Sequence, residues 1–253
     1  MKTSRYWVNE NLLKLTIEQQ EINLAEAIKK IIDAYIAARS EAFNDFITYC
    51  QQMIEIQAQE PDRAIEFIRG LLRPNIDARI FEIVSYAVLK QYYAGQQIYW
   101  GWSPDDLTVE SLSLYKTGRT NANDGGIDFV MKPLGRFFQV TETIDAGKYF
   151  LDIDKVQKYP TTFVVKTEEK INSILQAIEA QAKARYKVKA VVDSYMKAVE
   201  EVINIPKIME CFDAVLQAGR GAKVIDEIVL QSRLEFNVDG EDEDAVVEED
   251  LSS

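Results

Sequence analysis

The period of the hydrophobic pattern changes twice along the chain, and this feature constrains the fold most strongly. Apolar residues recur every three to four positions in the first third and the last third, as in amphipathic helices. Between Ser111 and Val165 apolar and polar residues alternate, as in half-buried strands. We therefore expect a sheet between two helical regions. The predicted helical segments are 16–59, 61–72, 76–93, 168–202 and 208–216, and the predicted strands are 97–102, 111–115, 127–131, 136–143 and 161–165.

The distribution of charge separates a tail from the rest of the chain. The 253 residues carry a net charge of -12, which at first argues against nucleic acid as a partner. Eight acids stand between Asp239 and Asp250, and without them the formal charge of the remaining chain is only -4. We expect 237–253 to be an acidic disordered tail, because a block of like charges repels itself and cannot bury a face. A DNA-mimicking or self-inhibitory segment is the alternative.

The residue types that are missing exclude several kinds of chemistry. The sequence has no histidine, and its two cysteines, Cys50 and Cys211, form no CxxC motif. This excludes a Ser-His-Asp triad, a Cys-His pair and a Cys/His zinc site, and it leaves carboxylates, lysines, hydroxyls and hard metal ions. The first ten residues lack the apolar core of a signal peptide, and no run of about 18 apolar residues occurs. We therefore expect a cytoplasmic protein that does not enter a membrane.

The strands on either side of Pro133-Leu134-Gly135 predict a hairpin with a polar patch. If Met131 faces Arg136 across the turn, Asp128 stands opposite Gln139, and Thr141 lies diagonally within about 7 to 8 Å. A carboxylate, an amide and a hydroxyl then converge on strands built mainly from Ile, Phe, Met and Val. A satisfied polar cluster or a solvated sheet face would explain the same pattern.

The residues Thr117-Gly118-Arg119-Thr120-Asn121-Ala122-Asn123-Asp124-Gly125-Gly126-Ile127-Asp128, followed by Phe137-Phe138-Gln139-Val140-Thr141-Glu142, resemble the active-site hairpin of PD-(D/E)XK nucleases, especially type II and Mrr-like restriction endonucleases. About 30 residues carry this resemblance. It implies an α/β fold with a restriction-endonuclease-like central mixed sheet flanked by helices. It also implies that Asp128 and Gln139 bind the metal ion, and that Thr141 replaces the usual motif lysine. Glu142 points to the opposite face, and Lys132 lies about 13 Å along the strand from Asp128.

The resemblance extends to the helix before the hairpin, which in such nucleases often supplies another carboxylate. Glu82, within Arg79-Ile80-Phe81-Glu82-Ile83-Val84, is the candidate, although a lone Glu on an amphipathic helix is more often solvated. Mg²⁺ held by Asp128, Gln139 and Glu82 would activate a water and stabilise the charge of the transition state. Thr141 could position the attacking water but cannot supply a charge.

Candidate DNA contacts cluster just before the hairpin. Lys116, Arg119, Asn121 and Asn123 are of the types that grip phosphates or read base edges, although a loop held by Asx turns would use the same residues. A basic run comprises Lys183, Arg185, Lys187 and Lys189 and is expected on a solvated helix face. Tyr99, Trp100 and Trp102 could stack on bases, but packing in the core is the favoured interpretation.

The resemblance implies a Mg²⁺-dependent type II restriction endonuclease that cuts double-stranded DNA in a restriction-modification system. The expected regions are a helical N-terminal layer (1–75), the nuclease core (76–167), a C-terminal helical region (168–236) and the acidic tail (237–253). By analogy we expect a homodimer, and a cognate DNA methyltransferase in the same system. The alternatives are a catalytically degenerate DNA-binding or assembly protein that retains the nuclease fold, and a helical scaffold in which the polar hairpin is incidental.

Overall fold

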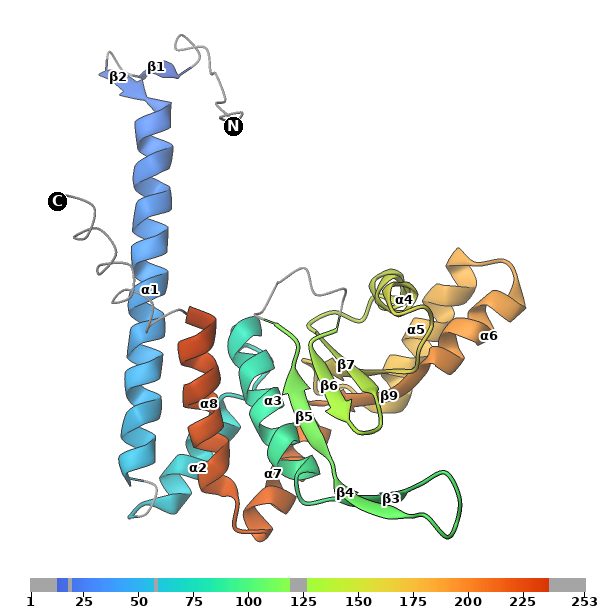
Figure 1. Ribbon diagram of the computed structural model, residues 1–253. Helices are drawn as coiled ribbons and strands as arrows, with labels where there is room; N and C mark the ends of the chain where they lie inside the picture. The colour runs from blue at the N-terminus through green and yellow to red at the C-terminus, as the bar shows by residue number, and fades with distance from the viewer. Residues whose placement is uncertain (1–12, 18–19, 57–58, 119–126, 237–253) are drawn as a thin grey trace, which may run out of the picture. The chain divides into compact units, whose positions relative to one another are not determined.

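The computed structural model describes residues 13–17, 20–56, 59–118 and 127–236 (Figure 1). The predicted tail at 237–253 lies outside the described residues. The chain divides into two compact units, residues 1–49 and 50–253. None of the helices in the described part of the chain is long and apolar enough to cross a membrane.

The first unit contains a short hairpin followed by a long helix. Strands β1 (Lys14–Ile17) and β2 (Gln20–Asn23) pair antiparallel, and α1 (Leu24–Ile56) follows directly. Asn23 Oδ1 accepts hydrogen bonds from the backbone N–H of Ala25 at 3.0 Å and of Glu26 at 3.3 Å, so this side chain caps the helix. The prediction of a helix from residue 16 is therefore wrong for residues 16–17 and 20–23, which lie in strands, because the cap at Asn23 fixes where the helix begins.

Two helices lead into the sheet of the second unit. Helix α2 (Pro61–Gly70) has its proline in the first turn, where no N–H is needed. Helix α3 (Ala78–Tyr93) confirms the prediction for 76–93 to within two residues, and Asp77 caps it by accepting from Arg79 N at 2.9 Å. Residues 81–89 of α3 are buried on every side, so this helix lies in the core and has no solvated face.

The central sheet has five strands in the order β5-β6-β7-β8-β9. Strands β5 (Ser113–Lys116), β6 (Phe129–Lys132) and β7 (Arg136–Thr141) pair antiparallel, whereas β8 (Thr161–Val165) and β9 (Val199–Asn204) continue in parallel. Helix α4 (Ala146–Lys155) connects β7 to β8, and α5 (Ile171–Arg185) and α6 (Lys189–Ala198) connect β8 to β9. Helices α7 (Ile205–Gln217) and α8 (Gly221–Phe236) are the last described elements of the chain. Strands β3 (Gln97–Trp100) and β4 (Thr108–Ser111) form a hairpin that is separate from the central sheet.

The observed pairing tests the sequence prediction for the sheet. Met131 pairs with Arg136 and Phe129 with Phe138, which confirms the predicted register of the hairpin. The expectation that residues 199–202 continue a helix is wrong, because they begin β9. Val199 and Val202 are spaced three apart, as on one face of a helix, and the pairing of β9 with β8 joins residues about 40 positions apart, so neither feature marks a strand in the local pattern.

The two faces of the sheet are covered by different helices (Figure 1). Helix α3 packs on the face that carries Phe129 and Phe138, with the Tyr86 ring 5.1 Å from that of Phe129. Helices α4, α5 and α6 cover the other face, where Tyr149 stacks on Phe163 at 4.1 Å. The second unit is thus an α/β structure with a five-stranded mixed sheet flanked by helices.

Candidate functional site

Asp128 lies where the hairpin strands part. The ladder of β6 and β7 ends with the pair Phe129 and Phe138, and Asp128 N donates to Phe138 O at 2.9 Å instead of continuing the same register. The next backbone donor on β7, Val140 N, bonds to the side chain of Asp128, whose Oδ2 accepts at 2.5 Å. On the other side, Thr117 N donates to Asp128 O at 2.9 Å. The carboxylate of Asp128 is therefore fixed in the plane of the sheet at its open end.

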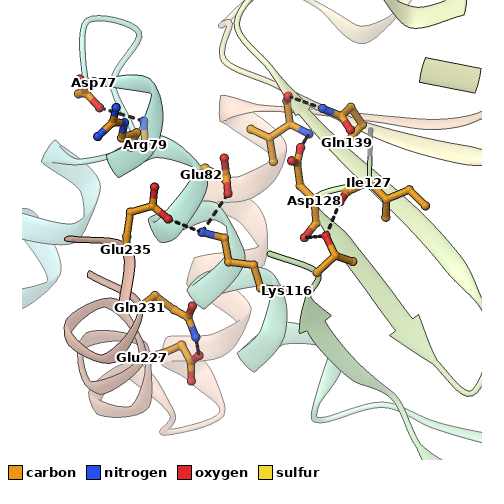
Figure 2. A network of polar contacts seen from close by, with 12 residues as sticks. Asp77, Arg79, Glu82, Lys116, Ile127, Asp128, Gln139, Glu227, Gln231 and Glu235 are labelled. Atoms are coloured by element: carbon orange, nitrogen blue, oxygen red, sulfur yellow. Dashed lines mark hydrogen bonds and ion pairs between the residues drawn. The ribbon is translucent and has the colours of Figure 1, made fainter. Parts of the chain in front are cut away.

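Gln139 meets Asp128 through the backbone of Val140. Its Nε2 donates to Val140 O at 3.3 Å, while Asp128 bonds to the N–H of the same residue (Figure 2). Gln139 Oε1 is buried and has no hydrogen-bond partner among the described residues. Asp128 and Gln139 were predicted to face each other directly. Instead, both side chains form hydrogen bonds with the backbone of Val140, Asp128 with its N–H and Gln139 with its carbonyl. A buried amide oxygen without a partner is costly, and it is the most unusual polar atom at this end of the sheet.

The motif lysine is replaced by Thr141, and neither Lys132 nor Lys166 places its ammonium group beside Asp128 in its stead. Thr141 is 3% exposed, and its hydroxyl lies 3.4 Å from both the N and the O of Thr143. Glu142 follows the end of β7, is exposed and forms an ion pair with Lys166. Lys166 also donates to Ile76 O at 2.7 Å. Lys132 lies over the Tyr115 ring, 4.9 Å from its centroid, and not over Asp128.

The two predicted ligands Gln139 and Glu82 belong to different faces of the sheet. Gln139 pairs with Phe163, which packs in the cluster under α4 and α5, so the two share that face. Glu82 is on α3, which covers the opposite face, and it is only 6% exposed, so the solvated-face interpretation of this residue is wrong. Within the described ranges, no group of three or more Asp, Glu, Cys or His side chains could by itself hold a metal ion.

Lys116 connects Glu82 to a residue that the sequence analysis missed. Its Nζ lies 3.0 Å from Glu82 Oε1 and 3.5 Å from Glu235 Oε2 of α8 (Figure 2). The predicted role of Lys116 as an exposed DNA contact does not fit this geometry, because its side chain is only 9% exposed. A signal for Glu235 existed in the sequence. Glu227, Gln231 and Glu235 are spaced four apart and so form one polar stripe on a helix.

A cavity adjoins these charges. It has a volume of about 390 Å³ and is lined by Tyr86, Tyr115, Lys116, Thr117, Gln231 and Glu235, among others. The Tyr86 hydroxyl donates to Leu114 O at 3.1 Å, and burial is the main cause that raises the pKa of this tyrosine. Next to it, Lys90 binds Glu227 at 2.7 Å, and Gln231 donates to the same carboxylate at 2.9 Å.

The remaining candidates lie apart from this site or outside the description. Arg119, Asn121 and Asn123 are outside the described residues. The basic run is exposed, as expected, and its Lys183 pairs with Glu179 at 2.7 Å. The prediction that three aromatic residues pack in the core is wrong, because they lie in the exposed β3–β4 hairpin. Tyr99 and Trp100 are in β3, and Trp102 is in the connection between β3 and β4. Their exposed fractions are 69% for Tyr99, 42% for Trp100 and 91% for Trp102.

Comparisons of the chain with known protein families, with curated proteins and with solved structures found no match.

Proposed function

We propose that this protein is a Mg²⁺-dependent endonuclease of the PD-(D/E)XK class that cuts double-stranded DNA as a type II restriction endonuclease. The observation that carries the proposal is the meeting of Asp128 and Gln139 at the Val140 backbone, at the open end of β6 and β7. The sequence motif, the predicted hairpin and the polar atoms converge there. The mixed sheet with α3 before it and the α4 crossover after it is compatible with the restriction-endonuclease-like fold.

The donor atoms at this point fit Mg²⁺. This ion prefers oxygen ligands, keeps several waters and takes only one or two carboxylates beside the phosphate oxygens of its substrate. Asp128 provides a carboxylate, and the unpartnered Oε1 of Gln139 provides a second oxygen that gains a partner when a cation is bound. Glu82 is on α3, which covers the other face of the sheet. It would hold a water near the scissile phosphate and would not itself bind the metal ion.

The proposed roles follow from what each side chain can do. A bound Mg²⁺ supplies a water of lowered pKa and a counter-charge for the pentavalent phosphate. Asp128, held by Val140 N–H, orients toward the open end of the sheet, and Gln139 fixes its amide against the Val140 carbonyl. Thr141 is bonded to the backbone of Thr143 and serves to shape the turn after β7.

The proposed partners are double-stranded DNA, a second copy of this chain and, within the same system, a cognate methyltransferase. Arg119, Asn121 and Asn123 precede Asp128 closely in the sequence and are the proposed DNA contacts. An apolar stripe on α1 favours an interface between two copies, since large apolar side chains that line one helix face commonly mark a contact surface. The side chains are 50–68% exposed and comprise Ile28, Ile31, Ile32, Tyr35 and Ile36.

The test is cleavage of a mixed plasmid substrate with and without Mg²⁺, by wild type and by Asp128→Asn. Asparagine keeps an oxygen for the Val140 N–H and removes the charge, so we expect the fold and the metal-free DNA affinity to persist. Cleavage should fall by about a thousandfold, equivalent to about 4 kcal/mol of transition-state stabilisation. Asp193→Asn, an exposed residue of α6, is the matched control and should cut like wild type. Full activity of Asp128→Asn would remove the assignment.

A catalytically degenerate DNA-binding or assembly protein is the second candidate. It is favoured by Thr141, which stands in the lysine position and cannot carry charge. Such a protein would bind DNA in the presence and absence of Mg²⁺, show no cleavage as wild type and lose nothing with Asp128→Asn. The same plasmid assay, combined with a DNA-binding titration, therefore separates the two functions.

A further inference from the structure

Three charged side chains from three separate elements are buried together at one end of the sheet. Glu82 comes from α3, Lys116 from the end of β5 and Glu235 from the last turn of α8, and their side chains are 8%, 9% and 5% exposed. Lys116 Nζ lies 3.0 Å from Glu82 and 3.5 Å from Glu235. Burial of such charges is expensive and is not a general route to stability, so a cluster of this kind calls for another explanation.

The chain ties this cluster to the candidate site. Thr117 follows Lys116 directly and donates to Asp128 O from its N–H at 2.9 Å, and its hydroxyl contacts both Ile127 O and, at 3.1 Å, Asp128 O. Lys116 also pairs with Phe129, the residue after Asp128, across β5 and β6. Any shift of Lys116 is thereby transmitted to the backbone of Asp128. Figure 2 shows the three charged side chains and Asp128 in the same region.

Metal-dependent phosphodiester hydrolysis needs side chains that are held in place before the reaction, because a preorganised site requires no reorganisation in the transition state. Thr141 carries no charge, and Lys166 is engaged by Glu142 and by Ile76 O. Lys116 is bonded to both carboxylates that line this end of the sheet on the α3 side.

We propose that Lys116 is a positioning residue of the nuclease centre, which orients Glu82 and Glu235 beside Asp128 and links α8 to the site. This inference rests on the proposed function. It replaces the role that the sequence suggested for Lys116, a direct contact with DNA phosphate. The two roles differ in what the residue changes: a positioning residue affects turnover, whereas a phosphate contact affects DNA affinity and its dependence on salt.

The experiment compares Lys116→Met, Lys116→Arg and Lys90→Met in the full chain. Methionine keeps an unbranched apolar stem without the charge, and we expect kcat to fall about a hundredfold while KM for DNA stays the same. Lys116→Arg keeps the charge and should recover most of the turnover. Lys90→Met is the matched control, because Lys90 also binds an α8 carboxylate, Glu227, at 2.7 Å, but among the described residues its contacts are with Glu227 and Tyr86 and not with Asp128 or β6. It should leave kcat unchanged.

A second measurement, DNA binding without Mg²⁺ at several salt concentrations, separates the roles independently of turnover. Wild type and Lys116→Met should have the same affinity and the same salt slope. A slope reduced by about one would show a lost phosphate contact and overturn the positioning role. So would an unchanged kcat in Lys116→Met while wild type cuts DNA.

A third variant covers the case in which Lys116→Met does not fold. Glu235→Gln removes the weaker of the two ion pairs and keeps a side chain of the same shape. It should lower kcat by several-fold without a change in DNA affinity, and an unchanged kcat would also overturn the inference. If wild type itself does not cut DNA under any metal condition, the proposed function fails first, and this outcome is distinguishable from loss in the variants alone.

Discussion

The two faces of the central sheet are built from different interactions. The face under α4, α5 and α6 is an apolar aromatic cluster, with Tyr149 stacked on Phe163 at 4.1 Å and Phe150 on Tyr195 at 4.3 Å. The face under α3 is also packed with buried apolar side chains, but ion pairs stand at its edge, where the buried Lys116 and the half-buried Lys90 bind carboxylates of α8. Apolar burial stabilises in proportion to area, whereas buried ion pairs contribute little net stability. The comparison indicates that apolar packing holds one face throughout, whereas the other combines apolar packing with positioned charges.

The largest effect should come from the apolar face. Phe163→Ala removes a side chain that is fully buried between Tyr149 and the strand neighbours of β8, and such truncations cost about 3 to 5 kcal/mol in unfolding free energy. Urea denaturation followed by circular dichroism measures this cost. Phe137→Ala is the control, because Phe137 is only half-buried and contacts Tyr159 at the rim. A loss below about 1 kcal/mol for Phe163→Ala would mean that this face is not the main source of stability.

The structure shows which parts of the fold a sequence pattern can specify. The hairpin of β6 and β7 was predictable in register because its alternation and the turn at Pro133 to Gly135 are both local signals. Strand β9 was not, because Val199 and Val202 have helical spacing and the partner strand β8 is distant in the sequence. The start of α1 was misplaced because residues 14–17 and 20–23 pair as short strands before the cap at Asn23.

The site was predictable only as far as local pattern reaches. Asp128 and Gln139 follow from the motif and the hairpin, but their contact through Val140 depends on where the strands part, which no residue pattern shows. The burial of Glu82 depends on α8, and Lys116 meets Glu235 across a sequence separation of 119 residues. Tertiary contacts of that range leave no periodic signal in one sequence. The four-residue spacing of Glu227, Gln231 and Glu235 places them on one face of a helix, but it shows neither that this face is buried nor what it binds.

The second effect tests Gln139, which lies on the apolar face but belongs to the proposed site. Gln139→Leu removes the amide oxygen, so we expect DNA cleavage to fall about a hundredfold, or about 2.7 kcal/mol. The same change deletes a buried atom without a partner, so the unfolding free energy should stay the same or rise. Gln139→Glu keeps an oxygen and should retain cleavage within about tenfold of wild type. Equal cleavage by the leucine and glutamate variants would show that this side chain does not contact the metal.

The smallest effect concerns a tyrosine hydroxyl of the apolar face that bonds to a carboxylate. Tyr195 donates to Asp154 Oδ2 at 2.7 Å, and this hydrogen bond is the main cause that raises the pKa of Tyr195 to about 12. An unfolded tyrosine ionises near pH 10, so above that pH the unfolded state loses a proton that the folded state retains. The stability from this bond is therefore complete below about pH 10 and is lost as the pH rises toward 12. Tyr195→Phe keeps the ring on Phe150 and removes the hydroxyl.

At pH 8 we expect Tyr195→Phe to be less stable than wild type by about 1 kcal/mol, the usual net contribution of one hydrogen bond. The difference should shrink as the pH approaches 12, because wild type loses its advantage while the variant has no hydroxyl to ionise at this position. Urea unfolding of both proteins at pH 8, 10 and 11 measures the difference directly. Other buried groups with a raised pKa, Cys50, Cys211 and Tyr149, are present in both proteins and cancel. A difference that is constant from pH 8 to 11 would show that this bond does not control the ionisation of Tyr195.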